Sequence, residues 1–132
     1  MSSSTTLQND DVIKLPLVAS DAVEFRGVLI ISSTSATPDI KLTLAVPSGA
    51  TIRWHGEYFE STSTYASGGV IVASGTTVVL PVTANQIGMF EFQGIVVNGA
   101  TAGDLQLQWA QNTSNAASIK VEQRSFITGS KF

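Results

Sequence analysis

The sequence predicts an all-β fold: a jelly-roll-like antiparallel β-sandwich of about eight strands, built from two similar four-strand halves. Short alternations of apolar and polar residues, separated by turn-forming residues, run along the chain, while no segment shows apolar residues at helical spacing between caps. The motif at residues 23–30 (VEFRGVLI) recurs at residues 90–97 (FEFQGIVV). Two such units packed face to face would form a jelly roll, which consists of two Greek keys.

The repeat extends into the flanks of both motifs. Leu15-Pro16 corresponds to Leu80-Pro81, and residues 39–42 (DIKL) correspond to residues 104–107 (DLQL). The offset is 65 residues in the flanks and 67 residues across the motif, so a small insertion before the second motif is undone by a shorter later loop. The pattern indicates one β-motif used twice within a single domain, which is the size that 132 residues suit.

The order of polar and apolar residues predicts the individual elements. Residues 1–11 are polar and show no period, so we expect a flexible N-terminal arm, or an arm that orders only against a neighbour, followed by one sandwich domain over residues 12–132. Pro16 cannot donate a ladder hydrogen bond and should end the first strand or confine it to a sheet edge. Gly27 and Gly94, inside the two core strands, predict a β-bulge or a close backbone approach. Strands are predicted at residues 12–15, 22–33, 40–46, 52–57, 70–72, 77–80, 90–97, 105–110 and 117–127.

The strand pattern also predicts which side chains are buried. Four large aromatic residues point inwards and should share the core: Phe25, Trp54, Phe92 and Trp109. Beyond Gly27 and Gly94 both core strands are apolar on both faces, so their outer side chains need cover from another part of the domain or from a second subunit. The candidates for burial between subunits are Val28, Ile30, Ile95 and Val97.

Composition limits the classes of partner. Only 13% of the residues are charged, about half the usual ~25%, which fits either a surface rich in Ser, Thr, Asn and Gln or a surface buried against other subunits. The net charge is −3 and the seven basic residues are scattered, which argues against nucleic acid. No stretch approaches the ~20 apolar residues that span a bilayer, and the polar start does not resemble a secretory signal. We therefore expect a soluble protein, either kept in the cytoplasm or carried out inside a larger particle.

Few residues suggest catalytic or metal chemistry, and cysteine is absent. His55 is the single histidine, but no serine has the sequence context of a nucleophile. Arg53 and Glu57 on the same face favour a structural or interfacial role for His55. Residues 9–11 (NDD) and Asp21 carry oxygen ligands that calcium prefers, without the spacing of a known binding loop. The sequence thus predicts no enzyme activity and no catalytic, cofactor or metal site.

A segment rich in Ser and Thr is the main candidate for recognition. Residues 58–69 form a predicted loop that contains Tyr58, Phe59 and Tyr65, and rigid aromatic rings among small polar residues suit contact with carbohydrate or protein. The alternative is that these rings cap the end of the sandwich. Residues 112–114 (NTS) match the N-glycosylation pattern, which we interpret as a chance match in a turn.

Three stretches carry a likeness to a known family: residues 7–11 (LQNDD), 15–19 (LPLVA) and 103–114 (GDLQLQWAQNTS). They resemble a family of small structural proteins of tailed bacteriophages, and the likeness covers most of the chain, with LQWAQN as its most distinctive part. The resemblance implies a β-sandwich similar to head-decoration and fibre-knob domains, which commonly assemble as trimers. It supplies no catalytic residues.

Together the residues and the resemblance predict a non-enzymatic virion protein, assembled in the host cytoplasm. The leading hypothesis is a trimeric capsid decoration protein that contacts the major capsid protein, or another virion protein, and stabilises the head. One alternative is a fibre, collar or tail-tip knob that contacts the host surface. An alternative of another class is a carbohydrate-binding module. We expect no partner that is a nucleic acid, a membrane or a cofactor.

Overall fold

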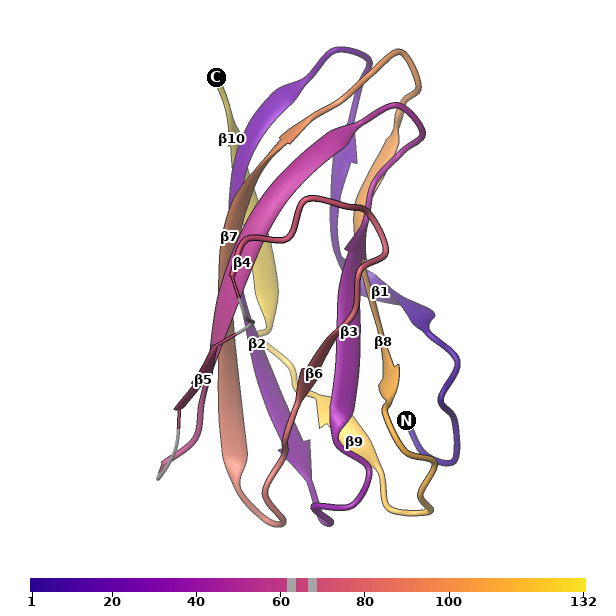
Figure 1. Ribbon diagram of the computed structural model, residues 1–132, viewed down its shortest axis with the longest axis vertical. Helices are drawn as coiled ribbons and strands as arrows, with labels where there is room; N and C mark the ends of the chain where they lie inside the picture. Colours follow the sequence, from indigo (N-terminus) through magenta and orange to yellow (C-terminus); the bar gives the residue numbers. More distant parts are fainter. Residues whose placement is uncertain (62–63, 67–68) are drawn as a thin grey trace.

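Ten β-strands in two antiparallel sheets make up the described part of the computed structural model, which covers residues 1–61 and 69–132 and the backbone of residues 64–66 (Figure 1). The strands are β1 Gln8–Leu17, β2 Ala22–Ser33, β3 Ile40–Ala45, β4 Thr51–Phe59, β5 Thr64–Ala66, β6 Val78–Leu80, β7 Ile87–Val97, β8 Gly103–Gln111, β9 Ile119–Val121 and β10 Phe126–Lys131. The small sheet has the order β1-β8-β3-β6. The large sheet has the order β10-β2-β7-β4-β5, and β9 also pairs with β2.

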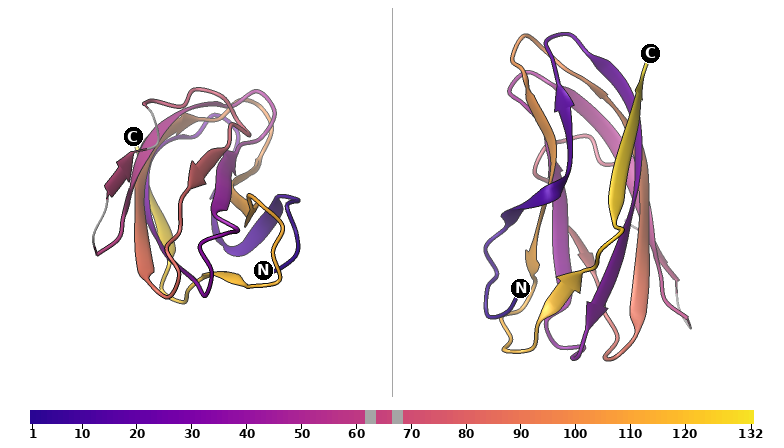
Figure 2. Two further views of the ribbon diagram at one scale, coloured as in Figure 1. Left: turned by 60° about the horizontal axis from the view of Figure 1, so that its bottom comes forward. Right: turned by 180° about the vertical axis from the view of Figure 1, so that it is seen from behind.

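The strand order is that of a jelly roll. The chain passes from one sheet to the other at every connection between consecutive strands except those from β4 to β5 and from β9 to β10. The central neighbours, β2 with β7 and β3 with β8, come from different halves of the chain. The predicted fold class is therefore confirmed. Figure 2 shows the two layers from two further sides, and the two chain termini lie towards opposite ends of the sandwich.

The two copies of the repeated motif pair with each other. In the large sheet Arg26 lies opposite Gln93, which is its own counterpart in the repeat. In the small sheet Thr43 lies opposite its counterpart Gln108. An approximate twofold axis through both sheets thus relates the two halves of the chain. In the small sheet it relates the edge strands β1 and β6. In the large sheet it relates β4, beside β7, to β9 and β10, beside β2. The halves interleave, and the expectation that they pack face to face as separate units is wrong.

The core lies between the sheets and is lined by the inward-facing residues of each alternation. At its centre Trp54 meets Phe92 edge-on, with ring centroids 6.3 Å apart, and Phe25 lies 6.4 Å from Phe92. These three aromatic residues are buried as predicted. Trp109 is only partly buried, at the margin of the core, where its Nε1 donates a hydrogen bond to Asp10 Oδ2 at 3.1 Å.

The two mid-strand glycines mark close approaches and not bulges. The pairing of β2 with β7 runs without a register shift along its whole length. Gly27 lies opposite Phe92, and Gly94 lies opposite Phe25. A Cβ on Gly27 would stand 2.2 Å from Phe92 Cζ, and one on Gly94 would stand 2.8 Å from Phe25 Cζ. Each ring therefore lies over the glycine of the other repeat.

The start of the chain differs from the expected flexible arm. β1 begins at Gln8, inside the range expected for the arm, and its register shifts between Asn9 and Lys14. Asp10 stabilises this irregularity, since its carboxylate accepts the backbone N–H of Ile13 at 2.8 Å. The residues before β1 bond to their own chain, as where the Ser3 N–H donates to the Asn115 carbonyl at 2.8 Å. Pro16 lies in an edge strand, as predicted.

Two later segments also differ from their predictions. The last predicted strand, residues 117–127, is two strands, β9 and β10, which pair in the same direction with successive parts of β2. A turn that contains Arg124, with φ of 73°, interrupts the pairing between them. The predicted strand at residues 70–72 is reduced to one bridge. There Ile71 exchanges two backbone hydrogen bonds with Trp54, of 3.0 and 2.7 Å.

Candidate functional site on the outer face of the large sheet

Polar side chains from three strands converge on the outer face of the large sheet. The register places Arg26 of β2, Gln93 of β7 and His55 of β4 side by side in one row, which we call the central row. The rows on either side of it are Glu24–Ile95–Arg53 and Val28–Glu91–Glu57. Outward residues stand roughly 6.7 Å apart along a strand and about 4.8 Å apart across strands, so neighbouring residues of two adjoining rows are close enough to line one hollow.

The contacts within these rows leave charge exposed. Gln93 Nε2 and His55 Nε2 lie 3.2 Å apart, so the amide orients the imidazole. Glu57 stands directly opposite Glu91, and both are exposed. Like charges in this position destabilise a strand pair. In the described part of the chain, no carboxylate of this face lies within 4.0 Å of an arginine nitrogen, so the face does not neutralise itself by ion pairs.

Two hollows flank the central row. The larger has a volume of about 410 Å³ and lies on the side of Glu24 and Arg53, where Ile95, Val97 and Val70 supply an aliphatic lining. The smaller, of about 220 Å³, lies on the side of Glu57. His55 and Gln93 line both hollows. The larger hollow is within the usual size range of small-molecule sites, roughly 300–1,000 Å³.

Apolar side chains gather at the end of this face where β7 begins. The register pairs Val28 with Phe126, and it pairs Met89 with Ile30 on one side and Phe59 on the other. Ile87, the first residue of β7, is the outward residue that precedes Met89. We call these six residues the Met89 patch. Ile87 is 69% exposed, Phe126 is 42% exposed and Met89 is 39% exposed. Exposed apolar groups that adjoin one another are typical of a surface that another molecule covers.

The four residues predicted for a subunit interface all lie on this outer face, in two groups. Val28 and Ile30 are half-buried and belong to the Met89 patch. Ile95 and Val97 lie at the other end and are 45% and 46% exposed. The repeat explains the division, because Ile95 and Val97 are the counterparts of Val28 and Ile30 across the approximate twofold axis. Their role as an interface stays a prediction.

The recognition loop predicted at residues 58–69 has to be corrected. Tyr58 and Phe59 belong to β4, and Tyr58 is only 1% exposed, so its ring cannot contact a ligand at the surface. The Tyr58 hydroxyl donates to Glu60 Oε1 at 2.9 Å. The alternative, that such rings close the end of the sandwich, describes Tyr58 correctly. Phe59 is partly buried, and the side chain of Tyr65 lies outside the described residues.

His55 has a setting that suits a surface contact. Its side chain is exposed and its hydrogen-bond partner is the neutral amide of Gln93. A neutral amide does not stabilise an imidazolium as the carboxylate of a catalytic triad does. The predicted structural or interfacial role of His55 therefore fits its neighbours on the central row.

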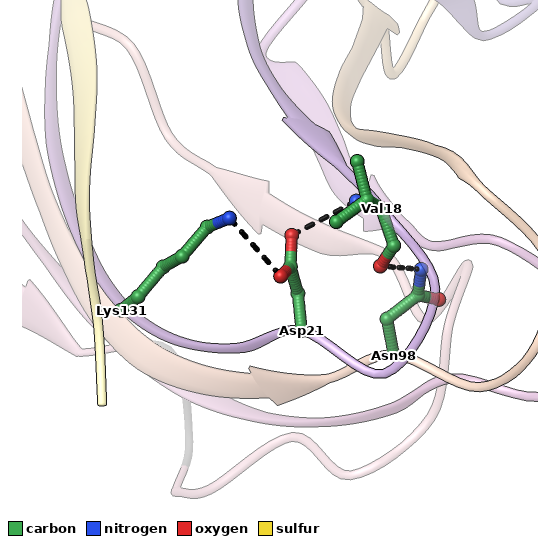
Figure 3. Close-up of polar contacts among 4 residues, drawn as sticks. All are labelled: Val18, Asp21, Asn98 and Lys131. Carbon is green, nitrogen blue, oxygen red and sulfur yellow. Dashed lines mark hydrogen bonds and ion pairs between the residues drawn. The ribbon is translucent and has the colours of Figure 1, made fainter.

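The carboxylates considered for calcium already serve structural contacts. Asp21 Oδ2 accepts the Val18 N–H at 2.8 Å, and Asp21 Oδ1 lies 3.2 Å from Lys131 Nζ (Figure 3). The pKa of Asp21 is lowered chiefly by the Val18 hydrogen bond, with a smaller contribution from Lys131. Asn98 closes the same turn by donating to the Val18 carbonyl at 2.9 Å. Among the described residues, no three of His, Cys, Asp or Glu gather as metal ligands would.

The triplet that matches the glycosylation pattern, residues 112–114, lies in the exposed connection between β8 and β9. The Thr113 N–H donates to the Pro38 carbonyl at 2.8 Å, which holds this connection against the one that precedes β3. The interpretation as a chance match in a turn stays a prediction.

The sequence did not identify the combination of Glu24, Arg53 and Gln93 around the larger hollow. The alternation in the sequence places each of these residues at an outward position of a strand, and it places Arg53 on the same face as His55. What the sequence lacked was the pairing of β7 between β2 and β4, which brings together residues about 30 to 70 positions apart.

Comparisons with models of known protein families, with curated proteins and with solved structures found no match for this chain. Within the described residues, no helix has the length and apolar character needed to cross a membrane.

Proposed function

We propose that this protein is a non-enzymatic structural component of a bacteriophage particle that assembles as a trimer and decorates the capsid. The observation that carries the proposal is the Met89 patch, a group of adjoining apolar side chains at one end of the large sheet. Ile87, Met89 and Phe126 present 69%, 39% and 42% of their surface in the isolated chain. The low charged fraction, 13%, and the sequence likeness to phage structural proteins support the same proposal.

A second copy of the chain is the partner that this patch suits. The patch joins six apolar residues, with the charged Glu91 at its margin beside Val28, and an apolar centre with a polar rim is typical of a protein interface. Around a threefold axis three such patches converge, and cyclic symmetry closes the assembly. Ile95 and Val97, the other two residues predicted for the interface, lie at the opposite end of the sheet. We place the subunit contact at the Met89 patch alone and use Ile95 and Val97 as the comparison in the experiment below.

Decoration would stabilise the capsid through multivalency. A trimer that sits on a junction of capsid subunits presents three equal surfaces, so each contact after the first forms at a raised effective concentration. Weak individual contacts then suffice to link the subunits. The residues before β1 remain the proposed source of some of these contacts, since they are polar and lie on the outside of the sandwich.

The oligomeric state tests this proposal directly. We expect the wild-type protein to be a trimer by size-exclusion chromatography with light scattering. The double variant Ile87→Asp, Met89→Asp should be a monomer, because two carboxylates would be buried without partners. The matched variant Ile95→Asp, Val97→Asp adds the same charges to the same strand and should remain a trimer. Circular dichroism checks that both variants fold.

Other results would show which part of the proposal is wrong: the assembly, the contact surface or the place in the particle. A monomeric wild-type protein would refute the assembly proposal. If only the Ile95→Asp, Val97→Asp variant dissociates, the contact lies at the opposite end of the sheet. The place in the particle follows from copy number in purified virions. A ratio to the major capsid protein near one indicates decoration, while a small fraction of it indicates a fibre, collar or tail-tip knob.

The alternative of a carbohydrate-binding module acting through residues 58–69 has less support, because Tyr58 is buried.

A further inference from the structure

The larger hollow on the outer face offers a complete set of hydrogen-bonding groups on rigid strands. Glu24 lies on β2, Gln93 on β7, and Arg53 and His55 on β4, around a volume of about 410 Å³. The backbone ladder on both sides of β7 fixes the spacing of these side chains. The contact between Gln93 and His55, at 3.2 Å, further orients two of them. Groups held on strands are positioned more precisely than groups on loops.

The chemistry of these groups favours a neutral ligand that both donates and accepts hydrogen bonds. Glu24 can only accept and Arg53 can only donate, while Gln93 and a neutral His55 can do both. The formal charges of Glu24 and Arg53 cancel, so the hollow selects neither an anion nor a cation. Donor-only and acceptor-only groups stand on opposite sides of Ile95, two strand spacings or roughly 10 Å apart. A ring that carries several hydroxyl groups can bond all of these side chains, because each hydroxyl both donates and accepts hydrogen bonds.

The lining between the polar groups is aliphatic. Ile95 lies between Glu24 and Arg53 in the register, with Val97 and Val70 beside it, and these three are 45%, 46% and 62% exposed. A pyranose ring has a polar perimeter of hydroxyls and an apolar face of C–H groups. The lining of the hollow has the same two parts, aliphatic side chains and polar groups.

We propose that this hollow is a binding site for a neutral saccharide unit. Glu24 and Arg53 hydrogen-bond its hydroxyls from opposite sides, Gln93 and His55 bond the edge between them, and Ile95 packs against its C–H face. The site lies at the opposite end of the sheet from the Met89 patch, so it stays open when that patch is buried between subunits. It does not depend on the assembly proposed above.

Amide NMR of the full chain tests the site with defined probes. Methyl α-D-mannopyranoside, methyl β-D-galactopyranoside and N-acetyl-D-glucosamine are titrated separately, each to about 50 mM, which detects dissociation constants far weaker than 1 mM. We expect at least one probe to shift the amides of Arg53, His55, Gly94 and Ile95. Arg53→Ala should weaken that binding by about tenfold or more, since it removes charge-assisted hydrogen bonds.

The matched control is Arg26→Ala, which removes an arginine from the same outer face but outside the larger hollow. It should leave the affinity unchanged. The proposal is overturned if none of the three probes shifts these amides, if the shifts map elsewhere, or if Arg53→Ala and Arg26→Ala weaken binding equally. Light scattering of the same samples reports the oligomeric state, so a failure of the assembly proposal is seen separately.

Discussion

At the scale of single residues, the large sheet depends on glycines that lie beneath aromatic rings. Gly27 and Gly94 accept the rings of Phe92 and Phe25, and Gly88 accepts the ring of Tyr58, whose hydroxyl would lie 1.9 Å from a Cβ at that position. A side chain at these positions would occupy the space of a ring. The rings in turn cover backbone that glycine leaves bare, as aromatic residues do for glycines in designed sheets.

Gly94 is the position where this packing can be tested most sharply. An added Cβ would lie 2.3 Å from the Arg53 carbonyl oxygen, which is backbone in a paired strand and cannot move aside cheaply. We expect Gly94→Ala to lower the free energy of unfolding by about 1–3 kcal/mol in urea denaturation, the usual cost of overpacking. Gly103→Ala is the control, because its Cβ would meet only the Pro47 side chain, at 3.0 Å.

The control should change stability by no more than about 1 kcal/mol in either direction, because alanine also restricts the unfolded chain. Equal midpoints for the Gly94 and Gly103 variants would mean that the sheet adjusts around residue 94. The close approach would then contribute nothing to stability.

At the scale of elements, the sequence predicted the long central strands well and the short peripheral ones poorly. In β2 and β7 an alternation leads through a glycine into an apolar run, and a long segment of this kind predicts a strand clearly, although β7 begins at Ile87 and not at residue 90. β9 and β10 were predicted as one strand, since only the backbone at Arg124, with φ of 73°, separates them. That backbone conformation accompanies the pairing of the two strands with different parts of β2, and the order of polar and apolar residues does not reveal it.

The C-terminal strand β10 is tied to the turn before β2 through one carboxylate. Asp21 accepts the Val18 N–H and pairs with Lys131, and its side chain is only 10% exposed (Figure 3). Because both contacts favour the ionised form, the pKa of Asp21 lies below its usual value of 3.8. The stabilisation is therefore present above the unfolded-state pKa and is lost as the pH falls through the lower, folded-state pKa.

Two variants of this contact should differ in a defined order. At about pH 6 we expect Asp21→Ala to be less stable than wild type in urea denaturation, and Lys131→Ala to lie between the two. The order follows from the pKa of Asp21, which the Val18 hydrogen bond lowers more than Lys131 does. The gap between wild type and Asp21→Ala should narrow as the pH falls below about 4. A gap that stays constant to pH 2.5 would show that the ionised carboxylate is not what stabilises the turn.

At the scale of the whole molecule, the repeat predicted the class of fold but not how the halves combine. The motif at residues 23–30 and its copy form the centre of one sheet, and their flanks form the centre of the other. The sequence shows two similar units, and either stacking or interleaving would bury their apolar faces. Interleaving is decided by the pairing of each core strand with its own counterpart, as between Arg26 and Gln93.

The candidate site was the least predictable part for the same reason. Glu24, Arg53 and Gln93 belong to three strands that become neighbours only through the jelly-roll order. Tyr58 was misplaced because the Ser- and Thr-rich composition after it suggests a loop, while tertiary packing against Gly88 extends β4 to Phe59. Local composition was outweighed by burial of a large ring.

The proposed assembly leads to a prediction about the stability of the whole molecule. If the folded chain is trimeric and the unfolded chain is not, mass action raises the apparent stability with protein concentration. For a trimer a tenfold increase adds about 0.9 kcal/mol per chain, which corresponds to a rise in Tm of roughly 2–5 °C for a domain of this size. Differential scanning calorimetry over a hundredfold concentration range measures it. The Ile87→Asp, Met89→Asp variant should show no dependence. Light scattering shows whether the samples are trimeric. If they are, and the wild-type Tm is nevertheless independent of concentration, the subunits fold fully before they associate. The Met89 patch would then add little to their stability.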